Sequence, residues 1–191
     1  MPVYNYVGEI CVEGIETFEE ILDSLKDKTI LVLDKCWDCW DKVYALLKEK
    51  NMVDQTIFKF YLKDEEPMVW AKAHKDCIFI PMCGDPEMFP KLLELREHAG
   101  LPAVEILPHA EDEPIFSDET FRWLEEHHIK VWCNSLSLAR RLVYGAGYDD
   151  LKSLRYGGDK GWGVLIDKGV QILQTDWPHE VACYLKEKKM R

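Results

Sequence analysis

The side chains of this sequence that could do chemistry are polar residues at the ends of short apolar segments. They are Asp34, Lys35, Lys59, Glu105, Asn134, Thr175 and Asp176. Lys59 is the most informative, because it lies between Phe58 and Phe60, where a lysine must extend to solvent or find an anion. A structural interpretation is open as well, since strand ends border solvent and tolerate charge. The set predicts either a ligand site or a solvated edge.

The elements that would position these residues alternate along the chain. Apolar, β-branched runs of strand length occur at 29–33, 56–61, 77–81, 103–107, 129–134 and 170–173. Helix-length segments are expected at 16–22 and 37–50, from Pro67, near 88–95, from Ser117 as N-cap, at 161–168, and from Pro178. Parallel neighbours require crossover connections, so this alternation predicts a parallel α/β sheet of about six strands. Ligands bind at the carboxyl edge of such sheets, where the polar residues collect.

Composition excludes several classes of protein. The 191 residues are 47% hydrophobic and 31% charged, which indicates one globular domain over 1–191. A formal net charge of −11 argues against a nucleic-acid partner, because phosphates would be repelled. No apolar run has the length of a membrane span, and the first residues do not form a signal peptide. We therefore expect a cytoplasmic protein if the sequence is complete.

The cysteines indicate a reducing compartment. There are seven, an odd number, and Cys77, Cys83, Cys133 and Cys183 lie in or beside apolar runs, as small buried side chains do. Cys36 and Cys39 form a lone C-x-x-C with no second pair at zinc-ligand spacing. We interpret the cysteines as structural thiols.

Four motifs resemble glycerophosphodiester phosphodiesterases, in the order in which that family carries them. Residues 14–22 followed by 30–35 are similar to a family helix and the strand that carries an acidic metal ligand and a lysine. Residues 130–134, Lys-Val-Trp-Cys-Asn, resemble the seventh strand, and 161–178, ending Thr-Asp-Trp-Pro, resemble the last unit. The likeness covers about 14–185. It implies a TIM barrel that hydrolyses phosphodiesters with a divalent metal, Ca or Mg, and two histidines.

The same resemblance implies that the chain is incomplete as a catalyst. Its six strands correspond to the family's third to eighth, so the first two units, with the His-Arg-Gly motif and the second catalytic histidine, are absent. None of the six histidines stands in such a motif, and His109, two residues past the fourth strand, is the one placed near the site. The resemblance therefore implies a phosphoric diester hydrolase scaffold, inactive as this chain, that binds a small phosphodiester.

The resemblance also assigns roles to residues at the carboxyl edge. Asp34 would be a metal ligand, Lys59 would contact the phosphate, and Trp132 would pack against the alcohol portion. The phosphate or substrate site would further include Lys35, Asn134 and Glu105. The family spaces its acid and lysine two apart, whereas Asp34 and Lys35 are adjacent and would point to opposite faces. Either Asp34 is the ligand, the alternative we prefer, or Lys35 is the matched lysine and Leu33 replaces the acid.

Three hypotheses follow: a piece of a phosphodiesterase that is inactive alone, a shortened relative that keeps an anion-binding rim, or an unrelated open α/β sheet. Strand order separates the third from the others, because a barrel keeps its strands in sequence order. A six-stranded partial barrel leaves two exposed edges, which invite pairing. We therefore expect self-association through the open edges or marginal stability.

Overall fold

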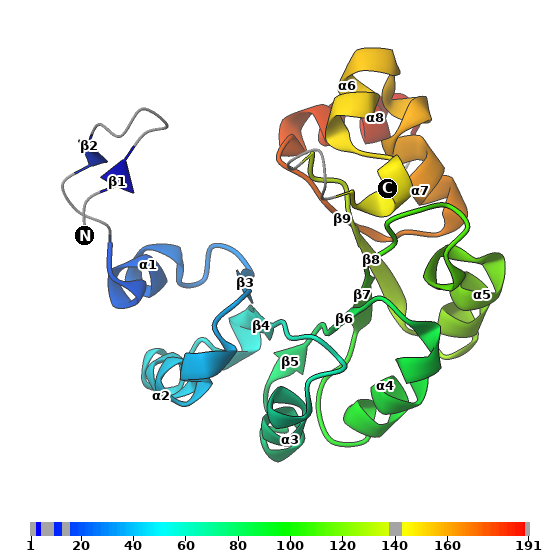
Figure 1. The fold of residues 1–191 in the computed structure, drawn as a ribbon. Coiled ribbons are helices and arrows are strands. Elements are labelled where there is room, and N and C mark those ends of the chain that lie inside the picture. The colour runs from blue at the N-terminus through cyan, green and yellow to red at the C-terminus, as the bar shows by residue number, and fades with distance from the viewer. Residues whose placement is uncertain (1–2, 5–9, 13–15, 138–142, 190–191) are drawn as a thin grey trace.

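The computed structural model shows a curved parallel sheet with helices on its outer face (Figure 1). The structure describes residues 3–4, 10–12, 16–137 and 143–189. The strands are β1 Val3–Tyr4, β2 Ile10–Val12, β3 Leu31–Leu33, β4 Thr56–Phe58, β5 Ile78–Phe79, β6 Met82–Cys83, β7 Ala103–Ile106, β8 Lys130–Asn134 and β9 Ile172–Gln174. The helices are α1 Phe18–Leu25, α2 Trp40–Lys50, α3 Glu65–Ala73, α4 Phe89–Arg96, α5 Asp118–Glu126, α6 Asp150–Tyr156, α7 Trp162–Lys168 and α8 Pro178–Glu187.

The parallel strands stand in sequence order, β3-β4-β5 and then β6-β7-β8-β9. β5 and β6 are two halves of one strand position, interrupted at Pro81, which has no N–H to donate. Hydrogen bonds cross the interruption, since Ile80 N–H donates to Phe58 O and Met82 N–H to Phe60 O. Six strand positions without a change of order confirm the predicted partial TIM-type barrel. The open-sheet alternative, which needs such a change, is wrong for these strands.

Strand alternation divides the sheet into an outer and an inner face. The outer face packs against the helices in one large core that includes Trp40, Phe58 and Phe79. The inner face carries a smaller apolar cluster of Ile80, Ala103 and Trp132, with Ile57 and Ile172 against it. Residues two positions further along these strands therefore face inward at the carboxyl edge.

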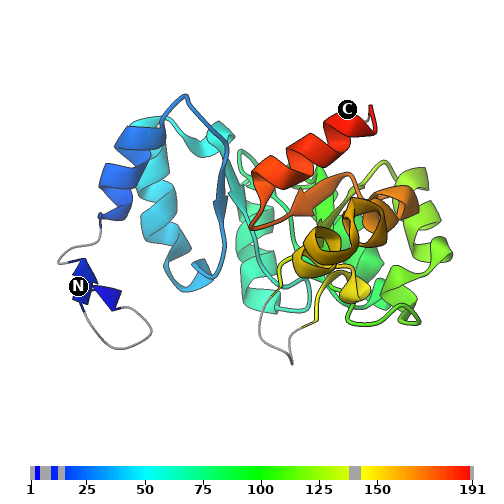
Figure 2. The same ribbon diagram turned by 90° about the horizontal axis from the view of Figure 1, so that it is seen from above.

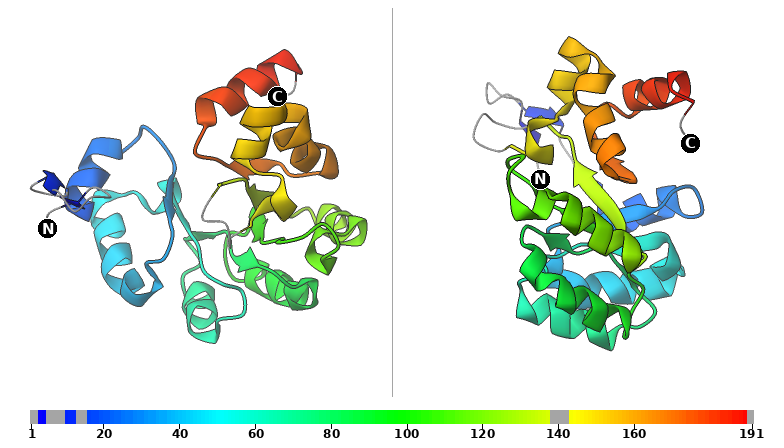
Figure 3. Two further views of the ribbon diagram at one scale, coloured as in Figure 1. Left: turned by 45° about the horizontal axis from the view of Figure 1, so that its top comes forward. Right: turned by 90° about the vertical axis from the view of Figure 1, so that its right-hand side faces the viewer.

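The first and last parallel strands do not pair with each other. Among the described residues, β3 pairs only with β4, and β9 only with β8. The views in Figure 3 show the sheet following the chain from the N-terminal helices to α8 without closing. At the β3 edge, Ile30 is 65% and Val32 41% exposed. Val32 is in register with inward-facing Ile57, so apolar inner surface is open there.

Several elements differ from the sequence predictions. The helix expected from Pro67 begins two residues earlier, at Glu65. Helix α6 lies in the Gly-rich connection, where no helix was predicted. The short antiparallel pair β1–β2 was also not predicted, and it lies beyond α1, away from the parallel sheet (Figure 2). None of the helices in the described ranges is long and apolar enough to span a bilayer.

A buried carboxylate fixes the end of the sheet. Asp150 is fully buried and accepts hydrogen bonds from Ser135 Oγ, Trp162 Nε1 and Thr175 Oγ1, at 2.7, 2.7 and 2.8 Å. A fourth bond comes from the backbone N–H of Asp176, at 3.0 Å. These hydrogen bonds tie the ends of β8 and β9 to α6 and α7. They also offset the free-energy cost of burying the carboxylate.

The turn before α8 contains Thr175 and Asp176, at the place where a helix cap would be expected. Instead, Trp177 is the N-cap position and makes no side-chain capping bond. Thr175 Oγ1 accepts from Trp177 N–H at 2.9 Å and donates to Asp150, so this threonine holds the turn.

The open β3 edge generates a prediction about association. We expect the chain to self-associate in solution, because apolar inner surface and unpaired strand groups are exposed together. Val32→Lys should shift sedimentation-equilibrium distributions toward monomer. Val69→Lys is the matched control, since Val69 is 66% exposed on α3, away from this edge. A monomeric wild-type protein that melts cooperatively would contradict this expectation.

Candidate functional site at the carboxyl edge

A buried ion pair lies at the carboxyl edge of the sheet. Lys59 follows β4, Glu105 lies in β7, and Lys59 Nζ is 2.5 Å from Glu105 Oε2. Each side chain is only 2% exposed. The two strand positions are separated by β5 and β6, so both side chains reach across the inner face. Lys59 alternates with Phe58 and Phe60, which are fully buried in the outer core, and this alternation turns the ammonium inward.

The environment of Glu105 disfavours its charge. Burial raises the pKa of Glu105 above its ordinary value of 4.5. The ammonium of Lys59 opposes that rise, and the nearby charge of Asp34 adds to it. The ion pair with Lys59 and the side chain of Asn134 both favour the charged carboxylate and so limit the rise of its pKa. The carboxyl group is therefore readily protonated when its partner is withdrawn.

Two strands beside the ion pair carry further unpaired polar atoms. Trp132 is in register with Glu105, and its ring lies 5.1 Å from Lys59 Nζ. Within the described part of the chain, neither Trp132 Nε1 nor Gln174 Oε1 has a hydrogen-bond partner, although both atoms are buried. Asn134 is in register with Gln174 and is 7% exposed, and its Oδ1 accepts from Leu136 N–H at 2.8 Å. Such unpaired atoms are costly unless a ligand or water uses them.

The structure separates Asp34 from Lys35. Leu33 packs into the outer core, so alternation places Asp34 on the inner side, and its charge acts on both Glu105 and Tyr61. Lys35 has a φ of 56° and is exposed. It takes part in none of the described ion pairs. The register favours Asp34 as the inward acid, and its role as a metal ligand stays a prediction.

A cavity of about 430 Å³ opens on the rim beside the ion pair. Its walls include Tyr61, Lys63, His109 and Tyr144. His109 is held in place, because its Nδ1 lies 2.6 Å from Val143 O, to which it can donate. Burial raises the pKa of the Tyr61 hydroxyl, and the charges of Asp34 and Glu105 add to the rise. The structure thus places His109, but no other histidine, in this cavity's wall.

Two residues of this edge, Gln174 and Tyr61, were not predicted from the sequence to belong to the site. Gln174 has no predicted role, yet it faces inward two residues after Ile172. Tyr61 was treated only as the end of a strand. In both cases the sequence pattern that predicts the inward orientation is the position two residues after an inward-facing residue of the same strand.

The described residues do not by themselves fit a divalent metal. Hard cations take about six oxygen ligands. In the described ranges, no group of three or more His, Cys, Asp or Glu side chains is arranged to hold a metal ion. Asp34 could supply one carboxylate, and Glu105 already faces Lys59. A Ca or Mg site at Asp34 stays a prediction, and no chemistry is derived from it.

The buried pair generates a stability prediction. Lys59→Met leaves Glu105 buried without its partner, so the free energy of unfolding should fall by about 3–5 kcal/mol near neutral pH. The raised pKa means that the folded state holds the proton more tightly than the unfolded state. The contribution of Glu105 to stability is therefore greatest below about pH 4.5 and is lost as pH rises through the folded pKa. Urea unfolding at several pH values should show the loss shrinking in acid.

The double variant Lys59→Met/Glu105→Gln is the control for this experiment. It removes both charges and keeps the shape, so it should recover most of the stability. A loss of under about 1 kcal/mol in Lys59→Met, at all pH values, would show that Glu105 is solvated and contradict the buried pair.

Comparisons with known proteins agree with this fold. The fold is similar to the crystal structure of a glycerophosphoryl diester phosphodiesterase from Parabacteroides distasonis, with a TM-score of 0.72 and 17% identity. The match covers 98% of this chain and 61% of that one, so the chain spans less than two thirds of that enzyme. At this identity the likeness shows the fold alone. No curated protein sequence matches the chain. Residues 81–185 match the family model DUF4996, described as a domain of unknown function, and the chain belongs to that family.

Proposed function

We propose that this chain is a glycerophosphodiester phosphodiesterase-like scaffold that binds a phosphodiester at its carboxyl edge and does not hydrolyse it alone. The observation that carries the proposal is the buried Lys59 beside Trp132, whose Nε1 has no hydrogen-bond partner among the described residues. Gln174 Oε1 is a second buried atom without a described partner, at the end of β9. A phosphodiester of a polyol offers oxygen acceptors to the indole N–H and hydroxyl donors to the amide oxygen. The structural likeness to a phosphodiesterase supports the same ligand class.

Protonation of Glu105 allows Lys59 to bind an anion, although the two residues form an ion pair in the structure. When an anion approaches the ammonium, Glu105 loses its partner, and burial favours its neutral form. Proton uptake by Glu105 then leaves Lys59 with an uncompensated charge for the phosphate. Trp132 closes the site from one side, because its ring already lies against the ammonium. Binding of an anion is thereby linked to binding of a proton.

Hydrolysis needs groups that this arrangement does not supply. Phosphodiester cleavage of the kind that the resemblance implies requires both a general base and a general acid. Of the six histidines, His74 stacks on Trp70 and His127 on Trp123, both on the helical side of the sheet. His109 reaches the rim cavity, but its Nδ1 is engaged by Val143 O. One histidine cannot fill both roles at the same time.

The linkage to protons generates a binding prediction. Dimethyl phosphate keeps a single negative charge across the neutral range, so it tests the protein's protonation alone. Its affinity, measured by isothermal titration calorimetry at two pH values, should be higher at the lower one, with proton uptake from the buffer. Trp132→Phe should weaken it about tenfold, through loss of one hydrogen bond. Trp177→Phe is the matched control, because Trp177 lies outside the site and is 42% exposed. Equal affinity at both pH values, or an unaffected Trp132→Phe variant, would contradict the proposal.

The second prediction concerns activity. With Ca or Mg present, the chain should not hydrolyse glycerophosphodiesters measurably, because only one histidine reaches the site. Release of free alcohol can be followed by a coupled enzymatic assay. Hydrolysis that disappears in Asp34→Ala would overturn this part of the proposal and show that other groups replace the missing histidines.

A further inference from the structure

The C-x-x-C of the sequence, Cys36 and Cys39, differs in its surroundings from the cysteines of the core. Cys77, Cys83 and Cys133 are buried, as the sequence predicts for structural thiols. Burial raises the pKa of Cys77 and of Cys133 to about 12 and that of Cys83 to about 11, which makes these thiols unreactive. Cys39 is exposed and Cys36 is half-buried, so core packing does not account for this pair.

A single turn of 3₁₀ helix, Trp37–Cys39, joins the two cysteines. Cys39 N–H donates to Cys36 O at 3.0 Å, which closes the turn. One such turn separates Cα atoms by about 6 Å, and disulfides span about 4.4–6.8 Å between Cα atoms. The Cys39 side chain already lies over the start of the turn, since its Sγ donates to Cys36 O at 3.3 Å. The backbone therefore holds the two thiols at a spacing that a disulfide can bridge.

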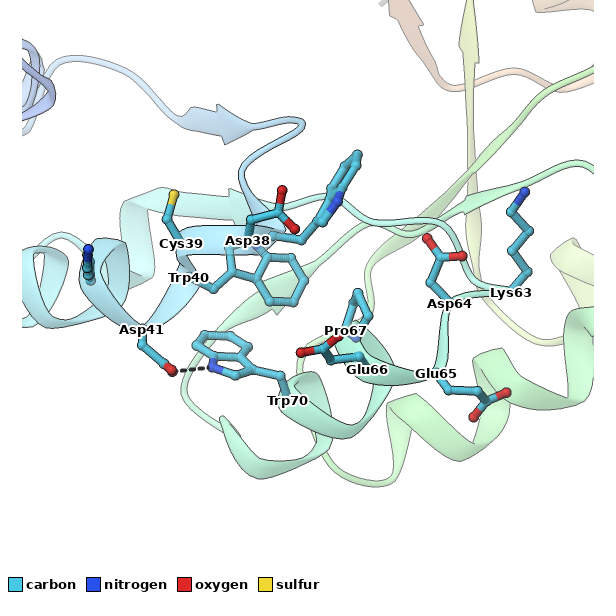
Figure 4. Close-up of a pocket in the computed structure, with 12 residues that line it drawn as sticks. Asp38, Cys39, Trp40, Asp41, Lys63, Asp64, Glu65, Glu66, Pro67 and Trp70 are labelled. Atoms are coloured by element: carbon cyan, nitrogen blue, oxygen red, sulfur yellow. Dashed lines mark hydrogen bonds between the residues drawn. The ribbon is translucent and has the colours of Figure 1, made fainter.

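The two sulfurs differ in their access to solvent. Figure 4 shows the Cys39 side chain at the start of α2, where it points away from the ring of Trp70. Trp40 Nε1 is buried without an oxygen or nitrogen acceptor among the described residues, and it is directed at the Cys36 thiol. An indole N–H is a donor only, so it favours the Cys36 sulfur as an acceptor in this place. Cys39 is thus the thiol that meets a reagent from solution first.

A disulfide fits this pair better than a metal ion does. A structural zinc site takes four ligands. In the described ranges, no third His, Cys, Asp or Glu side chain joins the pair in an arrangement that could hold a metal ion. A disulfide needs only the two sulfurs. In reducing compartments such bonds are usually transient and serve in redox sensing or in catalysis.

We propose that Cys36 and Cys39 are a reversible disulfide site, at which the two thiols are oxidised by exchange with a small-molecule disulfide. The Cys39 thiolate attacks one sulfur of that disulfide, whose S–S bond breaks and releases one small thiol. The Cys36 thiolate then attacks the Cys39 sulfur of the mixed disulfide and releases the second small thiol. The protein gives up two electrons and two protons, and the small disulfide takes up both to become two thiols.

The bond forms beside the carboxyl-edge site without being part of it. Trp37 lies inside the ring that the disulfide closes, and its indole contacts Tyr61 in the wall of the rim cavity. Closing the ring therefore restrains a segment next to that cavity. The inference does not depend on the phosphodiester proposal, because neither thiol lines the rim cavity or contacts the buried ion pair.

Peptide mapping of the full chain tests the proposal. The protein is equilibrated with mixtures of reduced and oxidised glutathione, alkylated with N-ethylmaleimide and digested with trypsin. Cleavage after Lys35 and Lys42 releases residues 36–42, which contain both cysteines. With oxidised glutathione in excess, this peptide should lack two hydrogens and carry no alkyl group. Dithiothreitol, added before alkylation, should restore both thiols.

Variants assign the order of the two steps. Cys36→Ser should stop the reaction at a mixed disulfide on Cys39, because the second thiol is gone. Cys39→Ser should leave a thiol that reacts with oxidised glutathione at least about tenfold more slowly, since access to solvent limits the attack. Cys183 is the internal control: it was expected to be buried but is exposed on α8, and no second cysteine is near it in sequence. It should form only a mixed disulfide.

The preformed turn gives a quantitative test. Disulfide formation in an unfolded chain must close a loop that the folded protein already holds closed. The equilibrium constant for oxidation by glutathione should therefore be at least about tenfold larger in the native protein than in concentrated urea. Free thiols in peptide 36–42 under conditions that modify Cys183, or an equilibrium constant no larger in the native protein, would overturn the proposal.

Discussion

The inner carboxyl edge of this incomplete barrel is organised around one interaction, the contact between Lys59 and Glu105. The interior of a closed barrel is filled by layers of mainly apolar side chains. Here an apolar layer around Ile80 and Ala103 lies beneath a charged layer at the carboxyl edge. Apolar side chains of similar volume would cost no more than this pair, because desolvation offsets most of its attraction. Stability alone therefore gives no reason for the pair, whereas a ligand site at that edge does.

Keeping these charges buried in an open sheet requires support from outside the barrel. The core between sheet and helices is continuous from Leu22 to Val170, so the helices hold the curvature without closure. At the last strands, the hydrogen bonds of Asp150 replace part of the support that a neighbouring strand would give. At the first strand there is no comparable device in the described residues, and Val32 stays exposed. The two open edges therefore differ in their structural support, and the β3 edge has less of it than the β9 edge.

Periodicity predicted most of the fold, because each strand and each amphipathic helix carries its own local pattern. It placed all six strand positions and the Ser117 cap, whose Oγ accepts from Thr120 N–H. It did not predict α6, since the surrounding glycines resemble a loop and Asp150 acts through contacts distant in sequence.

The site was predictable residue by residue but not as an assembly. Lys59 was recognised from its two phenylalanine neighbours, yet nothing local identifies Glu105, 46 residues later, as its partner. The aromatic cluster on the outer face shows the same limit, because Trp40 of α2 meets Trp70 of α3 through packing between residues distant in sequence. Leu33 faces the helices, so the alternation of side chains along the strand places Asp34, and not Lys35, on the inner face. Pairing across strands comes from topology, which a local pattern does not encode.

The charge of the whole chain acts against the proposed anion site. A net charge of −11 repels anions from the carboxyl edge. Salt screens this field over about 8 Å at physiological ionic strength, so the repulsion between the surface and an anion weakens as salt is added. An anion that enters the inner site must therefore rely on short-range contacts with Lys59 and Trp132, which is why the burial of these two residues matters more than the charge of the surface.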